Sequence, residues 1–167
     1  NPHLVAGNGY NALGYACMQT NAAAALLLLE RGADWRIRSK VGHRPLVHAA
    51  WLGHTDLVKR LLAKGADINA RGAWGMTPLA AACQGRRSAT ALFLIESGAD
   101  VHVRTVDGIN ALNLAASRNL TDVVRRLLAR GASAKLVATY NFDTFANGVD
   151  DERDKTLAQY HGDSSLA

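Results

Sequence analysis

The side chains that most often carry out chemistry are few in this chain, which has 167 residues, six histidines and two cysteines. No histidine is spaced from a cysteine or a carboxylate as a metal site or an activated nucleophile requires. Gly7-Asn8-Gly9 does not sit between a strand and a helix, so it lacks the context of a phosphate-binding loop. The residue types and their spacing therefore predict no catalytic residue, no metal site and no cofactor, and they indicate a protein that is not an enzyme.

The elements that position every side chain follow an internal repeat of 33 residues. Two sets of glycines recur at this period: Gly9, Gly42, Gly75 and Gly108, and Gly32, Gly65, Gly98 and Gly131. A fixed period of 20 to 50 residues indicates stacked structural units, each too small to bury its own apolar face.

Each repeat is predicted to hold two helices. Gly75 suits a tight turn, Thr77 is placed to cap the first helix, and Pro78 suits its first turn. Gly65 is placed to end a second helix in the left-handed conformation. The predicted inward residues of the second helices are Leu57, Val58, Leu61 and Leu62, then Leu92, Leu94 and Ile95, then Val123, Val124, Leu127 and Leu128.

These motifs resemble the ankyrin repeat. The resemblance rests on residues 44–50 (RPLVHAA), residues 77–83 (TPLAAAC) and the Gly-Ala-Asp of 32–34, 65–67 and 98–100, and it covers roughly residues 9 to 140. It implies an all-α ankyrin-repeat solenoid of stacked helix-turn-helix units with β-turn or hairpin tips. The departures from the family pattern are Ala12 and Ala111 in place of proline, and Gly14, Val47, Ala80 and Asn113 in place of histidine. His54 stands at a Gly-His position of the family, which implies a structural role.

The period divides the chain into segments. Residues 1–8 are the end of a preceding repeat or a lead-in, residues 9–41, 42–74, 75–107 and 108–140 are four repeats, and residues 141–167 are a degenerate capping repeat with an acidic tail. In that last segment Phe142 and Phe145 are expected to continue the core, and Asp151 to Tyr160 to form a short helix. Because the chain opens within the repeat pattern and without Met, we expect it to begin inside a longer or processed protein.

The cysteines are predicted to be buried and unpaired. Cys17 and Cys83 lie 66 residues apart, at the same position in two repeats. Stacked helices are about 8–10 Å apart, which puts the sulfurs about 20 Å apart, whereas a disulfide needs Cα atoms closer than about 7 Å. The longest apolar run, Ala22 to Leu29, is too short to span a bilayer. We expect a monomer, and the compartment is left open.

The net charge of +5 conceals an uneven distribution. Residues 1–142 hold 17 Lys and Arg against 8 Asp and Glu, giving +9, and residues 143–167 hold 2 against 6, giving −4. A basic body favours an acidic partner. One hypothesis is that the acidic tail competes with that partner, and the alternative is a solvated cap.

The family resemblance implies that partners are bound by turn tips and first helices. The residues at those positions are Tyr10, Arg38, Lys40, His43, Trp51, Leu52, Arg71, Trp74, Met76, Gln84, Arg104, Ile109 and Arg118. Trp and Arg are the side chains that most often carry interface energy, although a tryptophan can instead pack on a neighbouring repeat. Arg38, Arg71 and Arg104 form a ladder that is also common in the family, but the acid that usually follows is replaced by Ser39, Gly72 and Thr105.

The sequence therefore predicts a non-enzymatic protein-protein interaction module, which binds an acidic protein or peptide on its concave face as a scaffold, inhibitor or immunity-type binder. Two alternatives remain open. One is a binder of nucleic acid or of an anionic membrane surface, which is disfavoured because no basic run is longer than two residues. The other is the targeting arm of a longer bacterial effector enzyme, since the Ala, Leu and Arg content suits a bacterial source.

Overall fold

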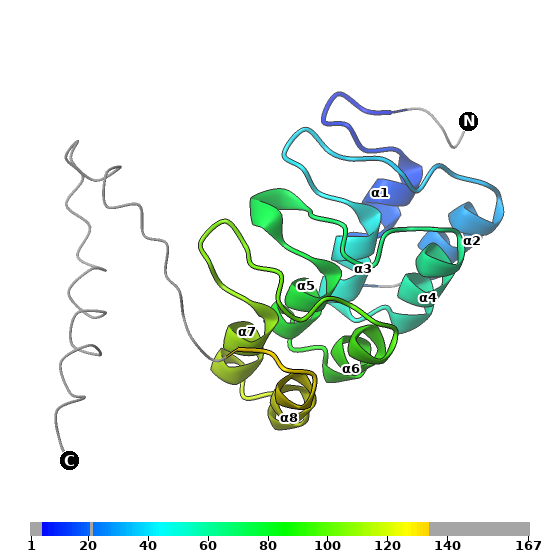
Figure 1. Ribbon diagram of the computed structural model, residues 1–167. Helices are drawn as coiled ribbons and strands as arrows, with labels where there is room; N and C mark the ends of the chain where they lie inside the picture. The colour runs from blue at the N-terminus through cyan, green and yellow to red at the C-terminus, as the bar shows by residue number, and fades with distance from the viewer. Residues whose placement is uncertain (1–4, 21, 134–167) are drawn as a thin grey trace, which may run out of the picture.

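The computed structural model describes residues 5–20 and 22–133, so the predictions for residues 141–167 lie outside the described residues. Within these two described ranges, eight α-helices form four pairs: α1 (Ala12–Ala16) with α2 (Ala23–Glu30), α3 (Pro45–Leu52) with α4 (Thr55–Ala63), α5 (Pro78–Gln84) with α6 (Ser88–Glu96), and α7 (Ala111–Ser117) with α8 (Thr121–Ala129). The odd-numbered helices stack in one layer and the even-numbered helices in a second (Figure 1). The all-α solenoid expected from the resemblance is confirmed.

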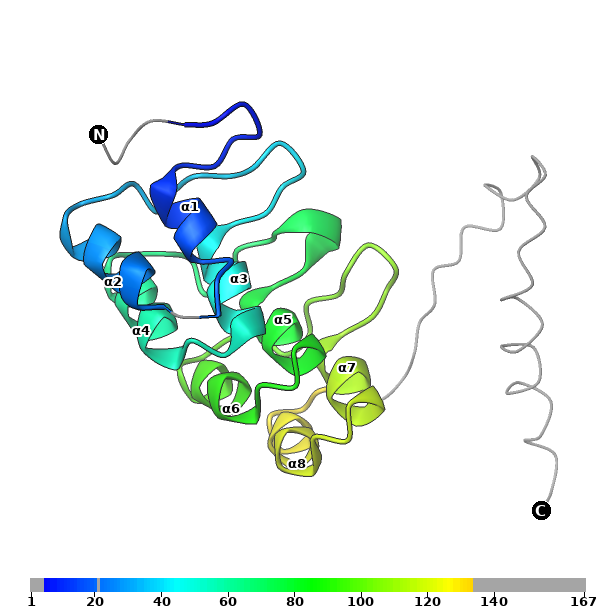
Figure 2. The same cartoon turned by 180° about the vertical axis from the view of Figure 1, so that it is seen from behind.

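Long connections link the second helix of each pair to the next first helix and project to one side of the layers (Figures 1 and 2). We call the tips of these connections, together with the turn that precedes α1, fingers: residues 6–10, 38–43, 71–76 and 104–109. The amide of Ser39 donates to the carbonyl of His43 (2.9 Å), and the amide of Thr105 donates to that of Ile109 (2.8 Å). An antiparallel bridge joins Arg104 and Asn110, so this finger is a hairpin, as predicted.

The predicted helix signals act as expected at several positions. The Thr77 hydroxyl accepts a hydrogen bond from the amide of Ala80 (3.2 Å). Gly65 ends α4 at φ +90°, where the amide of Ala66 donates to the carbonyl of Leu61 (3.0 Å). Capping therefore fixes where these helices begin and end.

The four first helices are not capped alike. Helices α1 and α7 lack the proline and are capped by Asn11 and Asn110, whose side-chain oxygens each accept a hydrogen bond from the backbone amide three residues ahead. The side-chain amide group of each asparagine also donates to the connection after the second helix of its pair. Asn11 donates to the carbonyl of Asp34 (2.8 Å), and Asn110 donates to the carbonyl of Ser133 (3.1 Å). In α3 the cap residue is Arg44, and no side chain caps that helix. Helix α3 thus lacks a contact usually worth about 1 kcal/mol.

The core runs between the two layers and contains most of the predicted inward residues. Leu57, Val58, Leu61, Leu94, Ile95, Val123 and Leu127 are fully buried, and Leu62, Leu92 and Val124 are partly buried. The prediction that Leu128 is buried is wrong, because its side chain is 50% exposed. Leu128 lies on α8, and no described helix packs beyond α8, whereas Ile95, at the equivalent position of α6, is fully buried and α6 packs against α8.

Contacts between repeats also come from side chains expected to be structural. His54 Nε2 lies 2.8 Å from the carbonyl oxygen of Gln19 in the preceding repeat, in agreement with the role that the resemblance implied. The Thr55 and Thr90 hydroxyl oxygens are 2.7 Å apart, which ties the start of α4 to α6. Such links hold neighbouring repeats in register.

Candidate functional site

The sequence-predicted binding residues divide by exposure. Arg38, Lys40, Trp51, Arg71 and Trp74 are exposed, His43, Leu52, Met76, Gln84, Arg104, Ile109 and Arg118 are half-buried, and Tyr10 is buried. All of them lie on the fingers or in and just after the first helices. We call the surface formed by the five exposed residues the finger face.

Trp51 stands near the end of α3 with 49% of its surface exposed. Its ring lies against the backbone of the next repeat, since a Cβ added to Gly85 would come within 2.4 Å of Trp51 Cδ1. Its carbonyl accepts a hydrogen bond from Arg87 Nε at 3.2 Å. The next repeat thus positions this tryptophan while leaving half of it open to solvent.

Trp74 is at the tip of the third finger and is 66% exposed. Its backbone has φ +53°, a left-handed conformation that is unusual for a bulky residue. The ring of His43 from the second finger packs edge-on against it, with ring centroids 5.8 Å apart, and the carbonyl of Trp74 accepts from the amide of Val106 in the fourth finger (3.0 Å). Contacts with both neighbouring fingers therefore hold Trp74 at the surface.

Tyr10, which the resemblance placed among the partner-binding residues, is buried, since only 5% of it is exposed. Its hydroxyl oxygen is 3.1 Å from His48 Nε2, and the His48 ring lies 4.8 Å from that of His43. Burial, with a smaller contribution from the neighbouring His43, lowers the pKa of His48 to about 4. His48 is thus neutral at pH 7, and Tyr10 serves as a structural link between the first two repeats.

Tyr15 was missed by the sequence reasoning, although it is 44% exposed. Its ring lies 5.5 Å from that of Tyr10, and its hydroxyl oxygen accepts from Asn8 Nδ2 (2.9 Å). The equivalent residue of the next repeat is His48, which Tyr10 covers. No described repeat precedes the first to cover Tyr15 in the same way. The sequence feature that could have identified Tyr15 is an aromatic residue in the first helix of the first described repeat.

Half-buried residues of the predicted set contribute mainly to packing. Met76 and Ile109 pack against the core from the third and fourth fingers, at the position that Tyr10 holds in the first. Arg118 follows α7, and its Nε is buried without a hydrogen-bond partner among the described residues. Met76 and Ile109 therefore anchor the third and fourth fingers to the core.

The arginine ladder braces the fingers. Arg71 Nη2 donates to the carbonyl of Arg104, and Arg104 Nη1 donates to the carbonyl of Gly108 (2.9 Å). Where an acidic residue was missing from the sequence pattern, the Ser39 hydroxyl accepts from the amide of His43 (3.0 Å) and the Thr105 hydroxyl from that of Ile109 (3.2 Å). Hydroxyl groups thus close these turns without adding negative charge.

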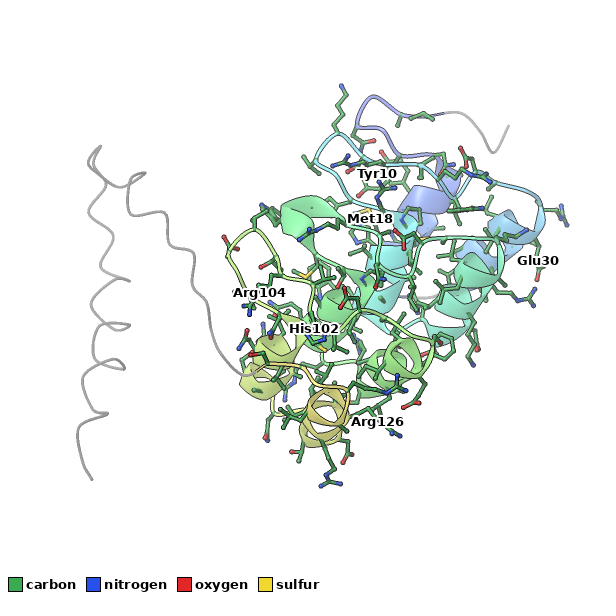
Figure 3. All side chains as sticks on the ribbon, in the orientation of Figure 1. Tyr10, Met18, Glu30, His102, Arg104 and Arg126 are labelled. Atoms are coloured by element: carbon green, nitrogen blue, oxygen red, sulfur yellow. The ribbon has the colours of Figure 1, made fainter. Side chains whose placement is uncertain are left out.

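Among the described residues, few negative charges lie close to the positive charges of the finger face. The ion pairs lie on the second-helix layer and its connections: Glu96 pairs with Arg126 (2.9 Å) and Arg130 (3.1 Å), and Glu30 is 3.7 Å from Arg60. Figure 3 shows Glu30 and Arg126 on that layer and Arg104 on the finger side. Arg38, Lys40 and Arg71 form no ion pair with any described residue, so no carboxylate in the described part of the chain pairs with these three charges.

The described residues contain no group of three or more His, Cys, Asp or Glu that can hold a metal ion. Cys17 and Cys83 are buried and unpaired, as predicted, and burial raises the pKa of each thiol to about 12. Both thiols are therefore poor nucleophiles at pH 7. No helix in the described part of the chain is long and apolar enough to cross a membrane.

A protein-family model described as ankyrin repeats (3 copies) matches residues 1–72 and again residues 69–139. The two matches together cover all four helix pairs. A search of curated proteins found no match to this sequence.

Proposed function

Because the chain belongs to the ankyrin repeat family, whose repeats are generally protein–protein interaction modules, we propose that it binds an acidic protein surface or an acidic extended peptide through the finger face. Trp74 and Trp51 supply the apolar contacts, and Arg38, Lys40 and Arg71 supply the charge. The module acts by occupying its partner, as a scaffold, an inhibitor or an immunity-type binder, and carries out no reaction.

The observation that carries this proposal is the conformation and exposure of Trp74. A left-handed backbone at a non-glycine residue costs about 1 kcal/mol or more, and such strain concentrates at functional sites. The side chain placed there is two-thirds exposed at 66%, so burial does not repay the strain. Tryptophan is the residue type most enriched among interface hot spots, which fits a role in binding.

The test compares capture and affinity for three proteins: the wild type, the double variant Trp51→Ala/Trp74→Ala, and the control Leu27→Ala/Leu128→Ala. The control removes two exposed apolar side chains, 51% and 50% exposed, from the second-helix layer. Partners captured from a lysate of the source organism are identified by mass spectrometry, and each is then titrated by calorimetry. Loss of one hot-spot side chain costs about 2 kcal/mol or more, so we expect affinity to fall at least about 30-fold for each tryptophan.

Equal affinity of all three proteins for the partner contradicts the finger-face assignment. Capture of nucleic acid or lipid alone, released at moderate salt and independent of both tryptophans, favours the polyanion alternative instead. If a longer form of the protein has catalytic activity and this chain alone binds the partner equally well, the chain is the targeting arm of an enzyme.

A further inference from the structure

A groove of about 730 Å³ lies among the connections, apart from the tryptophans of the finger face. It is lined by the connection after α2, the start of α3, the end of α4 and the connection after α4. Its charged lining residues are Arg36, Arg38, Arg44, Asp67 and Arg71. We call it the arginine groove, because four of its five charged lining residues are arginines.

The negative charge near the groove is already engaged. Asp67 Oδ1 accepts from the amide of Asn69 (2.9 Å) in its own turn. Asp34, which lines a neighbouring hollow, accepts from the amide of Arg36 (2.9 Å) and lies 3.9 Å from its guanidinium group. Arg38, Arg44 and Arg71 form no ion pair with any described residue. The groove therefore has a surplus of positive charge that a bound anion can neutralise.

The guanidinium groups are positioned by the fold. Arg44 Nε donates to the carbonyl of Arg71 (3.2 Å), which leaves its terminal nitrogens available. Arg71 Nη2 donates to the carbonyl of Arg104. The guanidinium carbon of Arg36 lies 4.6 Å from the centre of the Trp35 ring, which also lines the groove. Donors that are held in place lose less entropy when a ligand binds.

Comparison with the other repeats shows that this charge is local. The four residues at the position of Arg36 are His3, Arg36, Asn69 and His102, and those at the position of Arg44 are Asn11, Arg44, Thr77 and Asn110. The groove thus has two arginines that the repeat pattern does not require.

Arg44 also replaces a helix cap. Asn11, Thr77 and Asn110 each accept a hydrogen bond from the first turn of their helix, whereas Arg44 makes none and instead lines the groove. A residue that breaks a local structural rule without a compensating packing contact is expected at functional sites. The charged cavity and the missing cap therefore meet at the same residue, Arg44.

We propose that the arginine groove binds a small organic ligand that carries two or more phosphate groups. Guanidinium forks match phosphate oxygens in bidentate hydrogen bonds, which favours phosphate over a single carboxylate. The volume is within the range of about 300–1,000 Å³ typical of small-molecule sites and is larger than one phosphate requires. Trp35 adds an aromatic side chain to this lining, next to the guanidinium group of Arg36. The groove shares Arg38 and Arg71 with the finger face, whereas Arg36 and Arg44 belong to the groove alone, so a variant at these two positions leaves the five finger-face residues unchanged.

The test is calorimetric titration at about 0.15 M ionic strength, where exposed charges are largely screened. The probes are inorganic pyrophosphate, a nucleoside triphosphate and a sugar bisphosphate. The groove variant is Arg36→Gln/Arg44→Thr, and the control Lys59→Gln/Arg125→Gln removes the same charge from α4 and α8. We expect saturable binding at one site, an affinity at least about 30-fold lower in the groove variant, and less than a threefold change in the control.

Either organic probe binding more tightly than pyrophosphate supports the proposal and identifies the organic part. A second variant, Arg44→Lys, keeps the charge and loses the fork, so an affinity about tenfold lower supports specific recognition. Equal affinity of wild type and Arg44→Lys contradicts it. The absence of saturable binding of all three probes overturns the proposal, as does an equal loss in the groove variant and the control, since general charge then explains the binding.

Discussion

Replacing Arg44 by threonine is expected to stabilise the protein, although arginine is the natural residue. The backbone of Arg44 is extended (φ −123°, ψ 146°), close to that of Thr77 (φ −87°, ψ 161°), which caps α5. A threonine hydroxyl at position 44 therefore needs no backbone change to accept from the amide of Val47, as Thr77 does from Ala80. Among the four first helices, α3 is the one that lacks a side-chain cap at its N-terminus.

The magnitude follows from two terms. A new cap contributes about 1 kcal/mol. The lost hydrogen bond from Arg44 Nε to the Arg71 carbonyl is solvent-exposed, so its removal costs about 0.5 kcal/mol. The net gain is about 0.5 kcal/mol, which raises the melting temperature by about 1–2 °C in a protein of this size. Arg44→Ala loses the hydrogen bond and gains no cap, so it should lie about 1 kcal/mol below Arg44→Thr.

Urea denaturation followed by circular dichroism measures the free energy of unfolding of the three proteins, and scanning calorimetry measures their melting temperatures. The difference between Arg44→Thr and Arg44→Ala isolates the cap, because both variants lack the arginine. Equal stability of these two variants would refute the reasoning, since it means that the threonine makes no cap. A destabilised Arg44→Thr means that the arginine braces the connection more strongly than its one exposed hydrogen bond indicates.

Three further predictions concern the core and the buried titratable groups. Leu127→Ala, at a fully buried residue of α8, should cost about 2–5 kcal/mol in urea denaturation, whereas Leu128→Ala, 50% exposed beside it, should change stability by less than about 1 kcal/mol. Burial lowers the pKa of His48 to about 4 from an unfolded value near 6.5. Between these two pH values the unfolded state binds more protons than the folded state, so the free energy of unfolding should fall as the pH drops from about 6.5 to 4. The variant His48→Gln should show a smaller dependence of this free energy on pH. Burial raises the pKa of Cys17 and Cys83 to about 12, so an aromatic disulfide reagent at pH 8 should leave both thiols unmodified in the native protein and modify both in denaturant. Above pH 9 the free energy of unfolding should fall as the pH rises, because only the thiols of the unfolded protein ionise there.

Structural features that depend on residues within one repeat could be predicted from the sequence. The cap at Thr77 and the helix end at Gly65 involve residues only a few positions apart, so residue type and spacing suffice to predict them. The stripe of Leu57, Val58 and Leu61 predicts its burial for the same reason. The same pattern predicted the burial of Leu128 wrongly, because burial at this position requires a further helix packed against α8.

The finger face was predicted only in part. Trp51 and Trp74 are exposed as that face requires, but their conformations depend on Gly85, Val106 and His43 of neighbouring repeats. No spacing rule predicts the left-handed backbone of Trp74, whose carbonyl and ring contact the two neighbouring fingers. Charge counts revealed the basic body, whereas the placement of the ion pairs on the second-helix layer needed the structure.

The sequence by itself determined the repeat, its helix pairs, the turns and the family, because these follow from local capping, glycine conformations and apolar periodicity. Only the tertiary structure decided that Tyr10 is buried beside His48, 38 residues away. It also decided that Arg36 and Arg44 share a groove with Arg71, since stacking brings together residues about one period apart. Contacts between repeats set exposure and gather charge, and they depend on side chains that lie far apart along the chain.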